Sequence, residues 1–245
     1  MEAIVFFVCV VLFSSLINST FGFGFALLCM PLLSLRIDLK ILGPLVPLLF
    51  VVGSTIIIIR SWKDIDFKSI FPLIIGATLT VPFGVYLGKY GPEIIIKIVL
   101  CFVIILFSLY NIFAPKLPKL ESDKWAPFFG GLSGLFGGAY NISGPPAIIY
   151  GALRQWTPPV FRVSLQCYFL YVTFIVIGSH IYLGSYNNPL IGWYFLCAFP
   201  IMILAEPIGK KINSSIKDPV KFGRHVYLLM LLSGVLLVLK AFEMC

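Results

Sequence analysis

Six long apolar stretches, each close to the length that crosses a lipid bilayer, restrict this chain more than any other feature of its sequence. A membrane-spanning helix needs about 20 apolar residues. Hydrophobic residues make up 60% of the chain and charged residues 11%, whereas a soluble domain carries about 25% charged residues. We therefore predict an all-α polytopic membrane protein of the cell membrane, with the lipid bilayer as its solvent. The stretches cover roughly 41–59, 69–88, 93–113, 160–183, 190–209 and 225–242.

Two more apolar regions, roughly 3–35 and 126–153, are interrupted by glycine and proline. Three of the uninterrupted stretches follow each of them. Unwound backbone cannot face lipid, because its unpaired N–H and C=O groups are costly there, so it survives only when buried or lining a watery cavity. A pair of interrupted segments at matching places in two halves is the strongest sequence indication of a transporter's substrate site.

The lysines and arginines predict how the chain is threaded. Thirteen of the 18 fall in four segments, 60–68, 114–124, 154–162 and 210–224. If each interrupted region returns to the side from which it came, these 13 share one face and the other five share the opposite face. If each region crosses once, the division is 11 against 7. Cytoplasmic loops are enriched in Lys and Arg, so we expect returning hairpins, a cytoplasmic 13-charge face and both termini outside.

This threading divides the chain into two repeats, 1–113 and 125–245, joined by a cytoplasmic linker at 114–124. Each repeat contains a broken helical hairpin, re-entrant or half-spanning, followed by three transmembrane helices. Three crossings is an odd number, so the second repeat is inverted relative to the first, which is common in secondary transporters. Residue matches support the repeat, for example Pro82-x-Gly84 with Pro207-x-Gly209 at an offset of 125.

Each interruption predicts a helix start, where unpaired N–H groups and a positive dipole end favour an anion. In the second hairpin we expect Gly137 and Gly138 to end the first arm, and Asn141 and Ser143 to cap the next helix. Two such interruptions meeting near the membrane midplane would surround one small anion with donors. The candidate substrate-binding residues are Asn18, Ser19, Thr20, Gly22 and Gly24 in the first hairpin and Gly137, Gly138, Asn141, Ser143 and Gly144 in the second.

Other glycines and aromatic residues have simpler interpretations. Gly130, Gly131 and Gly134 form a small-residue pattern that is typical of closely packed membrane helices. Aromatic residues near the ends of the predicted spans are typical of anchors at the membrane–water interface. These are Trp62, Trp125, Tyr150, Trp156 and Trp193.

The glycine-rich segment Gly22-Phe-Gly24, with Pro31, and the segment Phe136-Gly-Gly-Ala-Tyr-Asn-Ile-Ser-Gly-Pro-Pro-Ala-Ile-Ile-Tyr150, followed by Phe161-Arg162, resemble the TauE/SafE sulfite-exporter family of membrane permeases. The resemblance extends over nearly the whole chain, and its most specific part is the Gly-Pro-Pro stretch that ends at Tyr150. It implies movement of small sulfur-containing anions, such as sulfite, thiosulfate or sulfonated carboxylates. The chain departs from the family pattern at Asn141-Ile-Ser143, where another glycine is frequent.

Ionisable residues within membrane spans are expensive and commonly functional. Arg162 either binds the anion through its planar guanidinium or reaches from the helix end to water. Glu206 either carries a coupling proton or forms an interfacial ion pair, and His180 is either proton-linked or a hydrogen-bonded structural residue. Gln166 and Tyr140 add hydrogen-bond donors to the candidate substrate site.

These features favour a secondary transporter that binds a small anion between the two hairpins and works by alternating access. The alternatives are a permease or channel for another small ion or metabolite and, with less support, an intramembrane enzyme. No Ser/His/Asp set, metal-binding motif or phosphate-binding loop favours catalysis, a metal or a cofactor. The basic residues follow a topology pattern rather than one for nucleic acid. Proton coupling and a homodimeric assembly are both left open by the sequence.

Overall fold

The computed structural model describes residues 2–113, 119–215, 226–235 and 239, and these residues fold into helices with no strand among them. The predicted all-α class is therefore correct. The remaining residues, which are 1, 114–118 of the predicted linker, 216–225, 236–238 and 240–245, lie outside the described part. The helices are α1 (Glu2–Phe21), α2 (Phe25–Leu33), α3 (Leu39–Ser61), α4 (Phe67–Tyr90), α5 (Glu93–Phe113), α6 (Ala126–Tyr140), α7 (Gly144–Leu153), α8 (Pro158–Tyr182), α9 (Pro189–Ser215) and an apolar helix Val226–Val235, with short 3-10 turns η1 (Trp62–Asp64), η2 (Asp123–Trp125) and η3 (Ser185–Asn187).

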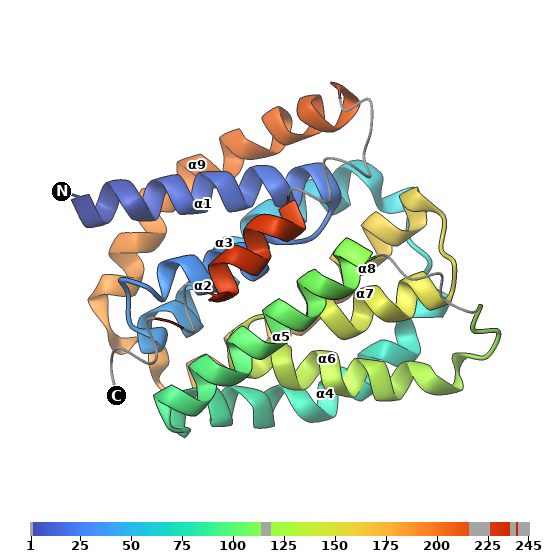
Figure 1. The fold of residues 1–245 in the computed structure, drawn as a ribbon, viewed down its shortest axis with the longest axis horizontal. Helices are drawn as coiled ribbons and strands as arrows, with labels where there is room; N and C mark the ends of the chain where they lie inside the picture. The colour runs from blue at the N-terminus through green and yellow to red at the C-terminus, as the bar shows by residue number, and fades with distance from the viewer. Residues whose placement is uncertain (1, 114–118, 216–225, 236–238, 240–245) are drawn as a thin grey trace.

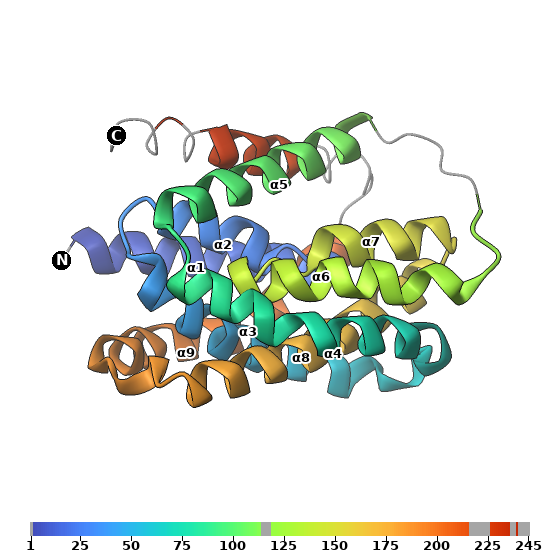
Figure 2. The same cartoon turned by 90° about the horizontal axis from the view of Figure 1, so that it is seen from below.

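The longer helices run roughly along the long axis of the molecule, as two perpendicular views show (Figures 1 and 2). Within the described residues, six helices are long and apolar enough to cross a membrane: α1, α3, α4, α5, α8 and α9. Five of them match the predicted stretches. The sixth is α1, whose apolar part Ile4–Phe21 is long enough to span by itself. Only the helix Val226–Val235 represents the predicted stretch 225–242 in the described part of the chain.

Helix α4 packs along α6, and α1 packs along α9. Glycines on both α4 and α6 allow the first of these contacts. A Cβ on Gly134 would lie 2.7 Å from the Cα of Ala77, and one on Gly138 would lie 2.7 Å from the backbone nitrogen of Val85. Gly130 meets the backbone of Leu73 in the same way. The close-packing interpretation is thus correct for Gly130 and Gly134, and Gly138 extends the same seam.

The basic segments gather at one end of the molecule. The Asp66 backbone N–H, just before α4, donates to Ser164 Oγ in the first turns of α8 at 2.9 Å. The Arg154 guanidinium, just after α7, donates to the carbonyls of Leu120 and Glu121 at 2.8 and 2.7 Å. These contacts bring the described parts of 60–68, 119–124 and 154–162 together, in agreement with the junctions seen in Figure 1.

Not every aromatic residue near a helix end faces outward. The side chains of Trp62, Trp125 and Trp193 are exposed. Tyr150, in contrast, is fully buried, and its hydroxyl donates to Asp123 Oδ1 at 2.7 Å. The interface-anchor prediction is therefore wrong for Tyr150, which ties the start of α6 to α7. The sequence could not distinguish these cases, because both place an aromatic ring near a helix end.

Candidate functional site

The first helix break, between α1 and α2, depends on two glycines. Gly22 and Gly24 have φ values of +81° and +105°, a left-handed conformation that glycine adopts without a steric penalty. Leu28 N–H makes the first hydrogen bond of α2, to the Gly24 carbonyl, at 3.1 Å. The N–H groups of Phe25, Ala26 and Leu27 precede that bond, so they have no partner within the helix.

The second break, between α6 and α7, begins later than expected. Gly137 and Gly138 lie inside α6, which continues to Tyr140. Asn141 then ends α6 with a φ of 59°, and a short asparagine tolerates this left-handed conformation. Ser143 occupies the cap position of α7, but its side chain makes no capping hydrogen bond. The expectation that Asn141 and Ser143 cap α7 through their side chains is therefore wrong.

The Asn141 side chain bonds to α3 instead of capping α7. Its Nδ2 donates to the Gly43 carbonyl of α3 at 3.0 Å. Pro145 and Pro146 occupy the first turn of α7, and they remove two of the donors that a helix start normally presents. The start of α2 consequently offers more free N–H groups than the start of α7.

A cavity of about 50 Å³ lies between the two breaks. The first break contributes Gly24 and the start of α2, and the second contributes residues 141–144. Of the predicted residues, Gly24, Gly137, Asn141, Ser143 and Gly144 line it. The rest of the wall is mainly apolar, with Thr173 of α8 as a polar addition that the sequence reasoning missed. Thr173 lies seven residues after Gln166 and so on the same helix face, which is the signal that could have found it.

Gln166 connects three elements beside this cavity. It is fully buried, and its Nε2 donates to Asn18 Oδ1 at 3.1 Å and to the Gly22 carbonyl at 2.6 Å. Its Oε1 accepts a hydrogen bond from Ser54 Oγ of α3 at 2.7 Å. The polar groups of Asn18 and Gln166 are thus used within the protein, where they join the end of α1 to α3 and α8.

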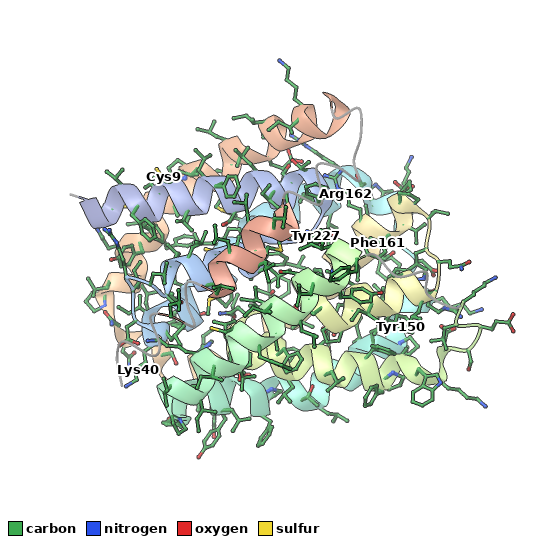
Figure 3. The ribbon with its side chains drawn as sticks, in the orientation of Figure 1. Cys9, Lys40, Tyr150, Phe161, Arg162 and Tyr227 are labelled. Atoms are coloured by element: carbon green, nitrogen blue, oxygen red, sulfur yellow. The ribbon has the colours of Figure 1, made fainter. Side chains whose placement is uncertain are left out.

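Arg162 lies one turn before Gln166. Its aliphatic stem packs against Gly22, and its Nη2 donates to the Ser19 carbonyl. Its Nε is buried and has no hydrogen-bond partner. Figure 3 shows Arg162 beside the end of α1. Ser19 and Thr20 in turn donate to the Glu206 and Gly209 carbonyls of α9 at 2.7 and 3.2 Å.

Glu206 forms an ion pair with Arg60 from the end of α3. The Glu206 side chain is only 4% exposed, whereas that of Arg60 is 46% exposed. The carboxylate also lies within electrostatic reach of Arg162. Of the two interpretations of Glu206, the structure contains the ion pair.

A larger cavity of about 570 Å³ lies beyond the second break, and we call it the vestibule. It is lined by Gly138 and Tyr140 of the predicted set, by His180 and by the residues around η3. His180 Nδ1 and Ser185 Oγ are 3.0 Å apart, so the histidine is hydrogen-bonded. Tyr186 donates to the Pro44 carbonyl at 3.1 Å and fastens η3 to α3. Burial raises the pKa of Tyr186 well above its ordinary value, which keeps the hydroxyl protonated.

The polar residues described above therefore occupy three places along α8. Arg162 and Gln166 lie beside the first break, Thr173 lies at the cavity and His180 lies at the vestibule. Across the described ranges, no group of three or more His, Cys, Asp or Glu side chains is arranged to hold a metal ion.

Comparison with known proteins places the chain in a family. No curated protein and no solved structure matches it. The family model described as sulfite exporter TauE/SafE matches residues 7–237, nearly the whole chain. The match covers both helix breaks, the cavity and the vestibule. The chain therefore belongs to the sulfite exporter TauE/SafE family, and it is a multi-pass membrane transport protein.

Proposed function

We propose that the protein is a secondary transporter that binds one small sulfur-containing anion in the cavity between the two helix breaks. The observation that carries this proposal is that both breaks, over a hundred residues apart in sequence, line one cavity. The starts of α2 and α7 meet there, so the positive ends of two helix dipoles act on the same small volume. Asn141, Ser143 and Thr173 add neutral donors to a mainly apolar wall.

The size of the cavity bears on the choice among sulfur anions. About 50 Å³ exceeds the ~10–15 Å³ that one water needs, and it is well below the ~150 Å³ of a cavity that holds benzene. An anion of a few heavy atoms, such as sulfite or thiosulfate, fits this conformation better than a sulfonated carboxylate. A larger anion would require the breaks to move apart.

The two breaks also supply a physical basis for alternating access. Gln166 and Arg162 hold the first break closed on one side of the cavity. Asn141 closes the other side by its hydrogen bond to Gly43. We infer that transport alternately releases these two sets of bonds. In both halves of the described chain, two helices joined by a break (α1–α2 and α6–α7) precede further apolar helices. This order supports our proposal of an inverted repeat in which each pair controls one side.

The orientation follows from charge. The end that carries Arg60, Lys124 and Arg154 is rich in basic residues, so by the positive-inside rule we propose that it faces the cytoplasm. The vestibule then opens to the outside and both termini lie outside. Glu206, paired with Arg60 near the proposed cytoplasmic end, remains the candidate for proton coupling.

Flux measurements on purified protein in liposomes test the proposal. Sulfite, thiosulfate and sulfoacetate are offered against acetate as a non-sulfur anion. We expect accelerated exchange of a sulfur anion when the same anion is present inside, and a loss of tenfold or more in Ser143→Ala and Thr173→Val. Ser179→Ala is the matched control, because Ser179 bonds the carbonyl of Ile175 in its own helix and lies outside the cavity.

Two results would contradict the proposal. Equal flux in Ser143→Ala, Thr173→Val and Ser179→Ala would remove the cavity from the transport path. Flux without exchange acceleration would instead indicate a channel, because a carrier must return its site and a channel does not.

A further inference from the structure

The vestibule carries charge of one sign. Its charged side chains are Lys40 and Lys89, and no Asp or Glu is among the described residues that line it. The neighbouring Asp38 accepts the backbone N–H of Lys40 at 2.7 Å and so caps α3. A hollow lined by cations and walled by apolar residues concentrates anions from solution.

One of these two lysines is held in place by contacts within the protein. Lys89 Nζ donates to the Leu183 carbonyl and lies 5.4 Å from the centre of the Tyr90 ring. Lys40 comes from the first turn of α3. Figure 3 shows Lys40 and Arg162 on opposite sides of the middle of the molecule. Asn187, Asn188 and Ser185 add neutral polar groups to the same wall.

Asn141 connects the vestibule with the cavity between the two breaks, which we call the inner cavity. Asn141 lines the cavity, and the Gly43 carbonyl that it bonds belongs to a residue lining the vestibule. Met30, another vestibule residue, has its sulfur 3.8 Å from Asn141 Nδ2. The two hollows therefore lie in series, with the Asn141–Gly43 hydrogen bond between them.

We propose that the vestibule is a second anion-binding site, separate from the inner cavity, which takes oxyanions and sulfonates through Lys40 and Lys89. Its volume of about 570 Å³ is within the ~300–1,000 Å³ of small-molecule sites. It therefore accepts organic sulfonates that the inner cavity excludes in this conformation. That this site supplies the inner cavity rests on the proposed transport function; its affinity for anions does not.

The first experiment measures the sign of the charge in the vestibule and does not depend on transport. Asn187→Cys places a thiol in the vestibule, in a background in which Cys9 and Cys245 are serine. The rates of modification by an anionic methanethiosulfonate (sulfonatoethyl) and a cationic one (trimethylammonioethyl) are then compared. We expect the anionic-to-cationic rate ratio to fall on the order of tenfold in Lys40→Gln/Lys89→Gln.

Two controls make the comparison specific. Lys63→Gln/Lys68→Gln removes the same charge from exposed positions at the other end, and we expect it to leave the ratio unchanged. Lys40→Arg/Lys89→Arg keeps the charge, and we expect it to retain the ratio, which also shows that the vestibule tolerates substitution. If the anionic-to-cationic rate ratio is the same in Lys40→Gln/Lys89→Gln as in Lys63→Gln/Lys68→Gln, the proposal is overturned.

The second experiment measures binding and transport. Sulfoacetate, which does not react with the thiol reagents, is expected to slow modification of Asn187→Cys by the neutral reagent methyl methanethiosulfonate, and the protection is expected to disappear in Lys40→Gln/Lys89→Gln. In liposomes, the same double variant is expected to raise the KM for the transported anion several-fold with the maximal rate retained. Absence of protection in the parent protein would refute the site.

The two proposals fail separately. If the parent protein moves no anion but sulfoacetate protects the vestibule thiol, the vestibule site stands and the transport function falls. If transport is present but its KM is the same in Lys40→Gln/Lys89→Gln and Lys63→Gln/Lys68→Gln, the vestibule does not supply the inner cavity.

Discussion

Replacing Gly134 with alanine tests how the first arm of the second hairpin is held against α4. The added methyl group would lie 2.7 Å from the Cα of Ala77 and 2.9 Å from its carbonyl oxygen. It would also lie 2.5 Å from Thr80 Oγ1, which is held by a hydrogen bond to the Gly131 carbonyl at 2.7 Å. The backbone of Ala77 cannot rotate away as a long side chain would.

The matched control is Gly131→Ala, one turn earlier on the same helix. There the nearest atom to the added methyl would be Thr80 Cγ2 at 3.7 Å, an ordinary contact distance. Both substitutions gain the same helix propensity, about 1 kcal/mol, so this contribution cancels when the two variants are compared. For Gly134→Ala the contact with Ala77 Cα must lengthen from 2.7 Å to about 3.4 Å, which separates α4 and α6 by about 0.7 Å.

Overpacking of this kind costs about 1–3 kcal/mol. We therefore expect the free energy of unfolding of Gly134→Ala to be about 1–3 kcal/mol lower than that of Gly131→Ala. Denaturant titration of the detergent-solubilised protein, followed by tryptophan fluorescence, measures the difference. If Gly134→Ala proves as stable as Gly131→Ala, the glycine seam does not set the distance between α4 and α6, and our account of this contact is wrong.

Three further predictions concern polar contacts and use the same unfolding measurement. Gln166→Leu removes three hydrogen bonds and Ser54→Ala removes one of them. At about 0.6 kcal/mol for each bond in a membrane protein, we expect the free energy of unfolding to fall by about 2 kcal/mol in the first variant and by about 0.6 kcal/mol in the second. Equal losses would contradict the three-way junction at Gln166. Arg60→Gln leaves the buried Glu206 carboxylate without its ion-pair partner, so we expect it to cost about 1–2 kcal/mol of stability. Glu206→Gln should cost less, because it leaves a half-exposed arginine that water can solvate. A larger loss in Glu206→Gln than in Arg60→Gln would refute this burial argument. Tyr150→Phe removes the hydrogen bond to Asp123 and is expected to cost about 1 kcal/mol, whereas Tyr182→Phe, at a 91% exposed residue, should cost nothing measurable.

The sequence predicted the membrane class and the approximate positions of the two helix breaks, because these depend on local properties. Lipid solvation is decided by the run of apolar residues, and a helix break by glycine and proline. It was less successful in assigning individual glycines. Gly138 was predicted to bind substrate, yet its α-carbon packs against α4 as Gly134 does. A glycine that permits close packing and one that approaches a ligand look the same in a sequence.

The candidate site shows the same division. Gly24, Asn141 and Ser143 were found because they interrupt helices, and all three line the inner cavity. Thr173 was missed because it lies in the middle of a regular helix and interrupts nothing, so that only its spacing of seven residues from Gln166 pointed to it. Gln166 was expected to add a donor to the substrate site, and anion binding was one of two interpretations of Arg162, but the hydrogen bonds of both go to the first break. Which partner a donor meets depends on which helix lies opposite.

The sequence by itself determined that this chain is helical, lies in a membrane and contains two helix breaks, since hydropathy, glycine and proline act over short distances. The tertiary structure alone decided that the two breaks share one cavity of about 50 Å³, that Asn141 closes it toward a vestibule, and that Lys40 and Lys89 lie in that vestibule. These are contacts between residues far apart in the chain. They arise from the packing of α8 against α3, α4 and α6, which no local pattern encodes.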